Sequence, residues 1–488
     1  MKLEKPFIFL FETPNGHYIY DVNTNAILET DISTYNVLQE MATGADTSSG
    51  LETLAEDDEC YGVNRMLKDG FLSANRIKEV VHPSTVLLPT ILENKISKIT
   101  LQVTQQCNLR CNYCTYSGTY LNRKHSKKIM KFETARKGID FIINHSIDCE
   151  RINIGFYGGE PLLEFKLIQA CILYAEEVAE GKELTFNITT NGTLLNDRII
   201  QFFQEHDVGL MISLDGPKEV HDRNRRFAVK DEGTFDKIFE NIKKIKAKYP
   251  DYFNKITFNA VMDPSNDDFK CSSQFFSGDD VIKDSFINPS TINSQYKEEE
   301  INLSDNFRER WGYEIFKLFL FKLNRLDERY VSKLVSAYFD RIRINLHEGR
   351  NLSSKMPDKV HHGGPCIPGA QRLFMNVHGD FFPCERVSEL SEVMNIGNVD
   401  KGFYLQKVED LLNIGKITED HCKECWAFRF CGLCAAAADN LTALSREQKL
   451  QQCANVRRTV EEMMKDYCTL VEFGYHFDDT DKPVLSYL

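Results

Sequence analysis

The residues best suited to chemistry in this sequence are three closely spaced cysteines, Cys107, Cys111 and Cys114. An apolar run at 99–103 predicts a short buried strand, so the cysteines fall on the loop that follows it. Three thiolates on one loop can hold three irons of a cubane iron–sulfur cluster and leave the fourth iron open to a substrate or cofactor. The alternatives are a structural zinc site, which needs a fourth ligand that no nearby Cys or His supplies, or three buried thiols.

Four further motifs follow the cysteines in chain order, and most of them come directly after an expected strand. They are Gly-Gly-Glu-Pro at 158–161, Thr-Thr-Asn-Gly-Thr at 189–193, Ser-Leu-Asp-Gly-Pro at 213–217 and His-Asp-Arg-Asn-Arg at 221–225. The cysteine spacing and these motifs, in this order, resemble the radical S-adenosylmethionine (radical SAM) superfamily. The resemblance implies a [4Fe–4S] cluster on the three cysteines, with S-adenosylmethionine (SAM) at its open iron.

The resemblance also implies which residues contact SAM. Tyr113 would lie against the adenine, and the segment 158–160 would hold the methionyl ammonium. Two glycines suit that segment because a backbone without side chains can approach a ligand closely. Asn191, Ser213 and Arg225 are candidates for the ribose and the SAM carboxylate, and each of these three could instead be an ordinary turn or surface residue. The implied contacts are Tyr113, Gly158, Gly159, Glu160, Asn191, Ser213 and Arg225.

The middle of the chain alternates between strand and helix patterns. Strands are predicted at 98–103, 151–156, 184–189, 209–214 and 255–261, and helices at 131–144, 164–179, 197–205 and 234–247. This alternation predicts an α/β fold of βα units around a parallel sheet, with functional motifs at the carboxyl ends of strands. The resemblance implies a partial (β/α)6 TIM-like barrel over residues 98–304.

Seven more cysteines gather toward the C-terminus, and their pattern over 363–460 resembles the SPASM domain, an appendage of radical SAM enzymes. The resemblance implies two auxiliary [4Fe–4S] clusters, and hence three clusters in all. Two residues separate Cys431 from Cys434, where that family usually has three. Two ribbon-type zinc sites are the alternative. The implied ligands are Cys422, Cys425, Cys431 and Cys453 (the Cys422 set) and Cys366, Cys384 and Cys434 (the Cys366 set).

The Cys366 set has three cysteines where a closed cubane needs four ligands. Sulfatase maturases, which resemble this chain here, have a cysteine a few residues earlier, and 359–365 contains none. We therefore predict an open iron that captures a substrate cysteine, which the metal would hold as thiolate. The alternative is a ligand from within the chain, for which the candidates are His361, His362, Cys271 and Cys468.

Residues 1–80 are predicted to form a separate module. Strands are expected at 7–11, 17–21 and 26–28, and helices at 32–41, capped by Asp31, and at 63–67. This order resembles the winged-helix-like element that recognises leader peptides of ribosomally made precursors, where the peptide adds as a strand to a sheet edge. A small packing domain or a winged-helix DNA binder would show the same elements.

The remaining segments connect these modules. Residues 81–97 are expected to be a linker, with Pro83 and Pro89 as breakers. Residues 263–304 lack periodicity and predict an irregular insertion over the barrel mouth. Long helices are expected from about 305 to 346, within a bridging region at 305–362, and residues 461–488 are expected to be a C-terminal tail. A polar, acidic stretch lies at 45–58.

Length and composition set the wider limits. A chain of 488 residues suggests two to four domains, and 42% hydrophobic with 27% charged residues is typical of a soluble globular protein. A net charge of −13 argues against nucleic-acid binding. Since no apolar run could span a bilayer and no signal peptide precedes the module, we expect a cytoplasmic protein without membrane or nucleic-acid partners. Fifteen cysteines in a reducing compartment indicate metal binding or chemistry.

The three modules together resemble peptide maturases of the sactipeptide and ranthipeptide type, which act in bacteriocin biosynthesis. The resemblance implies that a 5′-deoxyadenosyl radical abstracts a hydrogen from a Cys-rich ribosomal precursor peptide, and that a peptide cysteine bonds to that carbon as a thioether. The partners would be that precursor and a low-potential electron donor such as flavodoxin or ferredoxin. Glu385, which follows Cys384, is either a base for this reaction or a surface glutamate.

Two other functions stay open. An enzyme like the anaerobic sulfatase maturases, which generate formylglycine, would share the barrel and the SPASM domain. A non-catalytic iron–sulfur scaffold or electron carrier would use the clusters alone, and SAM cleavage by the reduced protein would distinguish it from an enzyme.

Overall fold

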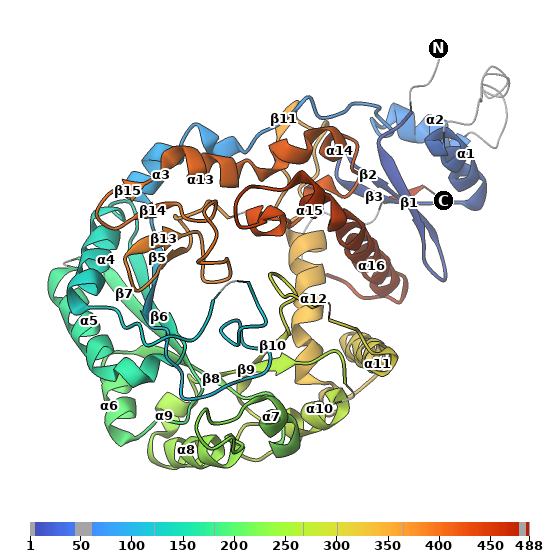
Figure 1. Ribbon diagram of the computed structural model, residues 1–488. Helices are drawn as coiled ribbons and strands as arrows, with labels where there is room; N and C mark the ends of the chain where they lie inside the picture. Colours follow the sequence, from blue (N-terminus) through green and yellow to red (C-terminus); the bar gives the residue numbers. More distant parts are fainter. Residues whose placement is uncertain are drawn as a thin grey trace.

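A curved sheet of ten strands is the largest element of the computed structural model (Figure 1). The structure describes residues 5–43, 61–121, 123–179, 181–266, 268–299, 301–364, 366–477 and 485–487, so the acidic stretch at 45–58 lies outside them. Neighbouring strands from β5 to β10 all run parallel, which confirms the α/β class. These strands are β5 (Lys98–Thr104), β6 (Arg151–Gly158), β7 (Glu183–Thr190), β8 (Val208–Ser213), β9 (Thr257–Met262) and β10 (Phe286–Thr291).

Helices connect these strands and cover the outer side of the sheet in Figure 1. In α4, Ile139 and Ile142 are fully buried, whereas Glu133 and Arg136 pair on the exposed face. An amphipathic helix buries one apolar stripe in this way. The predicted strands and helices of this region are confirmed to within a few residues. The helices are α4 (Phe132–Asn144), α5 (Phe165–Val178), α6 (Asp197–Glu205), α7 (Lys218–Asn224), α8 (Phe235–Lys248), α9 (Pro250–Phe253) and α10 (Phe269–Gly278).

The prediction of an irregular insertion at 263–304 is wrong for α10 and β10, which supply a helix and the sixth parallel strand, whereas the described residues at 292–299 and 301–304 contain no helix or strand. Phe269 and Phe276 of α10 are buried in the main core, and β10 pairs with β9. The strand β10 escaped notice because it lacks alternation and contains Pro289. Proline is tolerated there since β10 is an edge strand, where the missing N–H group can face away from the sheet.

The C-terminal region extends the same sheet from its other side. Leu373 and Met375 of β12 pair in parallel with Ile99 and Leu101 of β5, and three antiparallel neighbours follow. This continuity places Cys384, two residues after β13, in a fixed position relative to β5. The strands are β12 (Leu373–Met375), β13 (Asp380–Phe382), β14 (Gly397–Asn398) and β15 (Gly402–Phe403), and the helices are α13 (Leu405–Leu412), α14 (Glu419–Lys423), α15 (Arg446–Gln451) and α16 (Cys453–Glu472).

The N-terminal module contains the three antiparallel strands and two helices that the sequence predicts. They are β1 (Ile8–Glu12), β2 (His17–Asp21), β3 (Ala26–Thr30), α1 (Ile32–Thr43) and α2 (Tyr61–Lys68). Asp31 caps α1 as expected, since its Oδ1 accepts from the Thr34 backbone N–H at 2.8 Å. A hydrogen bond from the Thr13 N–H to the Gly16 carbonyl closes the turn between β1 and β2.

Two connecting segments differ from the prediction. The expected linker at 81–97 contains α3 (Leu88–Asn94), in which Pro89 occupies the first turn, a position that proline tolerates. Leu88 and Leu92 bury this helix against the main core. Before it, β4 (Glu79–Val80) pairs with β11 (Lys359–Val360). The bridging region holds α11 (Asp305–Lys322) and α12 (Ser336–Ile342), which continues as a π-helix over Arg343–Glu348.

The N-terminal sheet packs directly on the Cys-rich region. Phe11 and Tyr20 share a buried core with Phe428 and with Tyr467 of α16. The Tyr18 hydroxyl donates to Glu472 at the end of α16 over 2.7 Å. The helix α16 therefore crosses the expected boundary at 460 and belongs to both regions, and residues 461–472 are not a separate tail.

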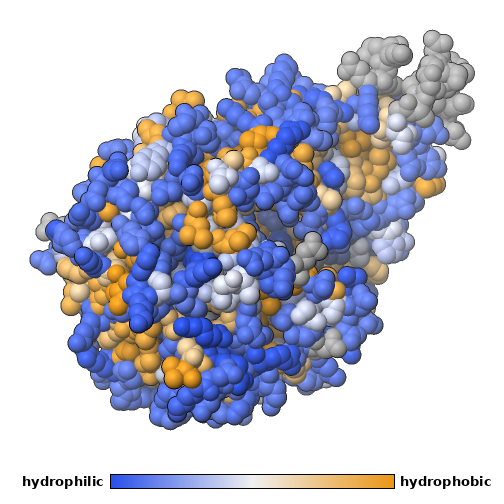
Figure 2. Space-filling model, viewed as in Figure 1, coloured by the Kyte–Doolittle hydropathy of each residue, from blue (hydrophilic) through white to orange (hydrophobic). Residues whose placement is uncertain are grey.

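The face of the molecule in Figure 2 is largely hydrophilic, with apolar residues in small patches and a hollow near the centre. Among the described residues, none of the helices combines the length and the apolar character that crossing a membrane requires.

We expect the stacked rings of Phe9 and Trp426, whose centres lie 3.6 Å apart, to hold the sheet on the Cys-rich region. Trp426→Ala should weaken this docking by about 1–3 kcal/mol, because it removes both apolar burial and the ring contact. Hydrogen exchange should then accelerate in Ile8–Glu12 and stay unchanged in β5 to β8. Tyr61→Ala, which changes a ring on the exposed side of α2, is the control, and equal exchange in both variants would contradict this role.

Candidate active site

The three cysteines of the first motif lie on the loop after β5. Cys107, Cys111 and Cys114 are each half-buried, and none forms a disulfide. Backbone N–H groups already point at two of the sulfurs, from Leu109 to Cys107 Sγ at 3.3 Å and from Tyr116 to Cys114 Sγ at 3.4 Å. Burial raises the pKa of all three thiols. They therefore hold their protons until a metal displaces them.

Gly158 and Gly159 bring the end of β6 against the segment that leads into the cysteine loop. The Gly159 N–H donates to the Thr104 carbonyl at 3.0 Å. A Cβ atom at Gly159 would lie 2.1 Å from the Gln106 carbonyl oxygen, and one at Gly158, whose φ is +151°, would lie 2.1 Å from that of Thr104. The two glycines thus allow two backbone segments of this chain to approach each other. From the sequence, we expected them to let the backbone approach a ligand.

Glu160 is buried at this junction and accepts hydrogen bonds on both carboxylate oxygens. Oε1 accepts from Thr190 Oγ1 at 2.6 Å, and Oε2 accepts from the Asn191 N–H at 2.8 Å. Burial raises the pKa of Glu160. Asn191 Nδ2 lies 3.9 Å from Cys107 Sγ. Glu160 therefore joins the ends of β6 and β7 and holds Asn191 beside the first cysteine.

Asp215 holds two of the predicted SAM contacts in place. Arg225 donates from Nε and Nη2 to its two oxygens at 2.8 and 3.1 Å, and the Tyr113 hydroxyl donates to the same carboxylate. Burial alone would raise the pKa of Asp215, but Arg225 lowers it below its ordinary value. Ser213, also predicted, ends β8 nearby and is buried. Asp215 lies within the 213–217 motif, yet the sequence analysis assigned it no role.

A second buried ion pair, which no sequence pattern marked, joins the cysteine loop to the C-terminal region. Arg123 and Glu389 pair with side chains that are 2% and 7% exposed. Gln102 of β5 donates to Glu389 at 2.6 Å, and the guanidinium of Arg123 lies 4.8 Å from the centre of the Phe374 ring. The pair ties the segment after Cys114 to the region that carries Cys384. Because Arg123 lies in a polar, basic stretch, its burial could not be read from composition.

The structure brings the Cys366 set together. Burial raises the pKa of both Cys366 and Cys384, followed by the Cys434 thiol at Cys366 and by the Glu385 carboxylate at Cys384. The backbones at Gly364 and Gly432 approach closely enough to bring the segments of this set together, because a Cβ at Gly364 would lie 2.2 Å from the Gly432 Cα. Glu385, the candidate base, is partly buried and accepts from Arg372 Nη1 at 3.4 Å.

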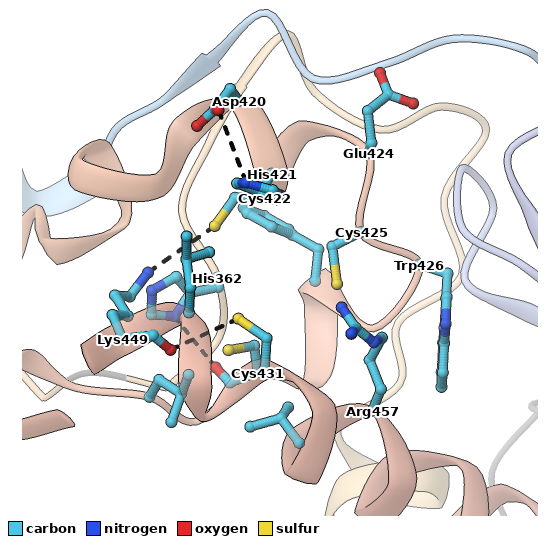
Figure 3. Close-up of a pocket in the computed structure, with 15 residues that line it drawn as sticks. His362, Asp420, His421, Cys422, Glu424, Cys425, Trp426, Cys431, Lys449 and Arg457 are labelled. Carbon is cyan, nitrogen blue, oxygen red and sulfur yellow. Dashed lines mark hydrogen bonds and ion pairs between the residues drawn. The ribbon is translucent and has the colours of Figure 1, made fainter. Parts of the chain in front are cut away.

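All four cysteines of the Cys422 set line one cavity of about 530 Å³. Figure 3 shows the sulfurs of Cys422, Cys425 and Cys431 turned into this space. The buried Lys449 ammonium donates to Thr418 Oγ1 at 2.6 Å and lies 3.9 Å from Cys422 Sγ. Sequence reasoning missed Lys449, since a lysine on a short helix usually faces water.

His362 also lines the cavity of the Cys422 set (Figure 3), although the sequence analysis considered it for the Cys366 set. Its Nδ1 lies 3.2 Å from the Cys431 carbonyl, and because a carbonyl only accepts, Nδ1 must donate. Nε2 is then left with a lone pair, and it is buried without a hydrogen-bond partner among the described residues.

The other three candidates for a fourth ligand are engaged elsewhere. His361 uses both ring nitrogens, accepting from the Gly415 N–H and donating to the His362 carbonyl. Cys271 is exposed on α10, and Cys468 is buried in α16. Within the part of the chain that the structure describes, no hydrogen bond, ion pair or ring contact joins these residues to the Cys366 set.

Comparison with known proteins agrees with this geometry. Residues 101–270 match the model of the Radical SAM superfamily. A cysteine-type anaerobic sulfatase-maturating enzyme of Clostridium novyi is 33% identical over 33% of this chain and 43% of its own length. The radical SAM cyclopropyl synthase TigE of Paramaledivibacter caminithermalis is 26% identical over 42% of this chain and 45% of its own. This chain is an enzyme of the radical SAM class.

The radical SAM segment reaches from β5 into α10 and contains all three loop cysteines. The solved structure of native anSMEcpe with bound AdoMet and Cp18Cys peptide has a TM-score of 0.56 and 19% identity, and the match covers 77% of this chain and 98% of that one. This likeness shows a shared fold that extends beyond the radical SAM segment. The chain spans less than half the length of the two curated relatives.

The residues present fit the cluster and the SAM that this class implies. The loop offers three free thiols beside the Asn191 amide, and the Cys422 cavity contains the unpaired Nε2 of His362. In the described ranges, no three His, Cys, Asp or Glu side chains converge closely enough for a single metal ion. An iron–sulfur cube is larger than one ion, so its ligands stand further apart.

We expect Asp215→Ala to lower the free energy of unfolding by about 3–5 kcal/mol, because it leaves the Arg225 guanidinium buried without its partner. The double variant Asp215→Ala/Arg225→Met should be more stable than the single one, since no buried charge remains. Chemical unfolding of the apoprotein measures both. Asp236→Ala, which breaks the exposed pair with Lys218, should change stability by about 0–1 kcal/mol. A single Asp215 variant as stable as that control would contradict the anchoring role.

Proposed function

We propose that this radical SAM enzyme modifies a ribosomally made, Cys-containing precursor peptide and forms cross-links from cysteine sulfur to carbon. The observation that carries the proposal is the N-terminal sheet seated on the Cys-rich region. Phe9 of β1 stacks on Trp426, the residue after Cys425, so the module that resembles a peptide-recognition element lies beside the cavity of the Cys422 set.

The relatives support a peptide substrate. The name of the Clostridium novyi relative refers to sulfatase maturation, which is the modification of a protein, and one solved neighbour is described with a bound Cp18Cys peptide. We extend this substrate class to the present chain. A cavity of about 570 Å³ beside Cys434 offers room for an extended segment, and amide side chains of Asn293, Gln448 and Gln452 line it. An amide side chain can donate from its NH₂ group to the carbonyl groups of a peptide backbone and can accept from the backbone N–H groups through its oxygen.

The chain's own residues would do the following work. Cys107, Cys111 and Cys114 would hold the SAM-binding cluster, which, when bound with SAM and reduced, supplies the radical that abstracts hydrogen. Asn191 and the Asp215–Arg225 pair border this place and shield it with buried side chains. The buried Lys449 ammonium offsets negative charge gathered on the Cys422 set.

The Cys366 set is where we place the peptide thiol. Among the described residues, no contact joins His361, His362, Cys271 or Cys468 to this set, so we assign its fourth position to a substrate cysteine. Glu385 follows Cys384 and accepts a long contact from Arg372, so it could accept a proton from that thiol. We further propose that a low-potential donor such as flavodoxin or ferredoxin delivers the electron and that the protein works in the cytoplasm.

Formylglycine formation is the second candidate, and the sulfatase maturases among the relatives favour it. It would use the same cysteine loop and place Glu385 as the base that deprotonates the substrate cysteine or serine. The two reactions differ in product, because formylglycine made from cysteine loses the sulfur whereas a thioether keeps it.

The triple variant Cys107→Ala/Cys111→Ala/Cys114→Ala should form no 5′-deoxyadenosine from SAM after reduction, while it retains part of its iron in the other two sets. Chromatography of the nucleoside and iron analysis measure the two effects. The variant Cys149→Ala, which changes a thiol outside all three sets, is the control. Normal deoxyadenosine formation by the triple variant would contradict the assignment of these cysteines.

Mass spectrometry of a Cys-rich precursor peptide co-expressed with the enzyme tests the reaction itself. A thioether should appear as a loss of two hydrogens per bridge, with all sulfur retained and one cysteine per bridge no longer alkylated. Glu385→Gln should reduce modification by at least about tenfold while uncoupled SAM cleavage continues, if Glu385 is the base. A product that has lost sulfur and gained an aldehyde would support formylglycine formation instead.

A further inference from the structure

The N-terminal sheet has a fourth strand that comes from the opposite end of the chain. β16 (Leu485–Tyr487) pairs in parallel with β3, so that Leu28, Glu29 and Thr30 lie opposite Leu485, Ser486 and Tyr487, respectively. The sheet order is β1-β2-β3-β16. The edge of β3 therefore accepts an added strand in this structure.

The two faces of the sheet leave no room for a peptide. Ile19 and Leu28 pack on one face with Leu38 of α1 and Met66 of α2. Phe11 and Tyr20 pack on the other face with the Cys-rich region. A peptide can thus join this module only along an edge, where backbone N–H and C=O groups are available for a new ladder.

The opposite edge is less suited to this role. β1 lies against the Cys-rich region, where Phe9 stacks on Trp426 and the Arg76 guanidinium lies 4.2 Å from the centre of the Phe7 ring. β3 contributes Ile27 to the core shared with that region, and its edge is paired with β16.

We propose that β16 is an occupant of the β3 edge from the same chain, and that an extended precursor segment must displace it before it can add to the sheet. The proposal rests on the peptide-modifying function proposed above. It adds that the site is closed until a peptide competes successfully for it. An incoming segment longer than three residues would form more ladder bonds than β16 does, so it could replace β16.

The position of α16 makes this competition effective. The helix ends at Glu472, which accepts from the Tyr18 hydroxyl of β2 at 2.7 Å, so the following residues start next to the sheet. A tethered segment has a high effective concentration at a nearby site. The apparent affinity for a peptide falls by the fraction of molecules whose edge is open.

A fluorescein-labelled synthetic peptide of residues 478–488 is the probe for this edge, and fluorescence anisotropy measures its binding to the full chain. Leu485→Pro/Ser486→Pro should release β16, because proline removes the N–H groups that a ladder needs. This variant should bind the probe at least about tenfold more tightly than the parent, the factor expected if about a tenth of parent molecules are open. Ser486→Thr, which keeps the N–H group and favours a strand, should bind like the parent.

Hydrogen exchange of Leu28–Thr30 gives a second measurement on the same proteins. These residues should exchange faster in the double-proline variant than in the parent, and saturating probe should restore their protection. A peptide of the same composition in scrambled order is the control for the probe. Equal binding by all three proteins, or no binding by the double-proline variant, overturns the proposal.

These experiments need neither iron nor SAM, so they separate this inference from the proposed reaction. If the enzyme proves inactive on every peptide but the probe results hold, the docking site stands and the proposed function fails. If a precursor is cross-linked yet never competes with the probe, the function stands and the docking site lies elsewhere.

Discussion

The meeting of two backbones at the ends of β5 and β6 is the constraint on which this active site depends. Gly159 donates to Thr104 and Glu160 donates to Gln106, over distances at which no Cβ would fit at either glycine. This contact fixes the position of the cysteine loop relative to the end of β6. Glu160 extends this contact to the end of β7, because its carboxylate accepts from the Asn191 backbone N–H and thereby holds Asn191 beside Cys107. A single methyl group at Gly159 would separate these elements.

A similar close contact between two backbones occurs in the C-terminal region, where Gly364 lies against Gly432. There it lets the chain before Cys366 approach the chain before Cys434, so that cysteines far apart in the sequence reach one place. The sheet adds a second constraint, because β12 pairs with β5 and thereby fixes the Cys366 set relative to the first loop. The Arg123–Glu389 pair supports this link from inside the barrel. Both positions are thus determined by backbone contacts rather than by flexible loops.

Local patterns explain what could be predicted from the sequence. The strands β5 to β9 and their helices have clear periods, and Asp31 has the right type and position for a cap, so these elements followed from residues alone. The strand β10 did not, because an edge strand with Pro289 carries no period. Contacts between segments that are far apart in the sequence could not be predicted either. Nothing in the sequence around His362 indicates that it faces the Cys422 set, and nothing around Leu485 indicates a place beside β3.

The helix α16 sets the distance between recognition and chemistry. It begins at Cys453, in the cavity of the Cys422 set, and ends at Glu472, against Tyr18 of the N-terminal sheet. Its 20 residues rise about 30 Å. An extended peptide covers about 3.3–3.6 Å per residue, so about nine residues are needed to reach from one end to the other. On the proposed function, a precursor bound beside Tyr18 would therefore need a spacer of about that length to bring a cysteine to the Cys453 end of α16, which would make spacing, as well as sequence, a determinant of the substrate.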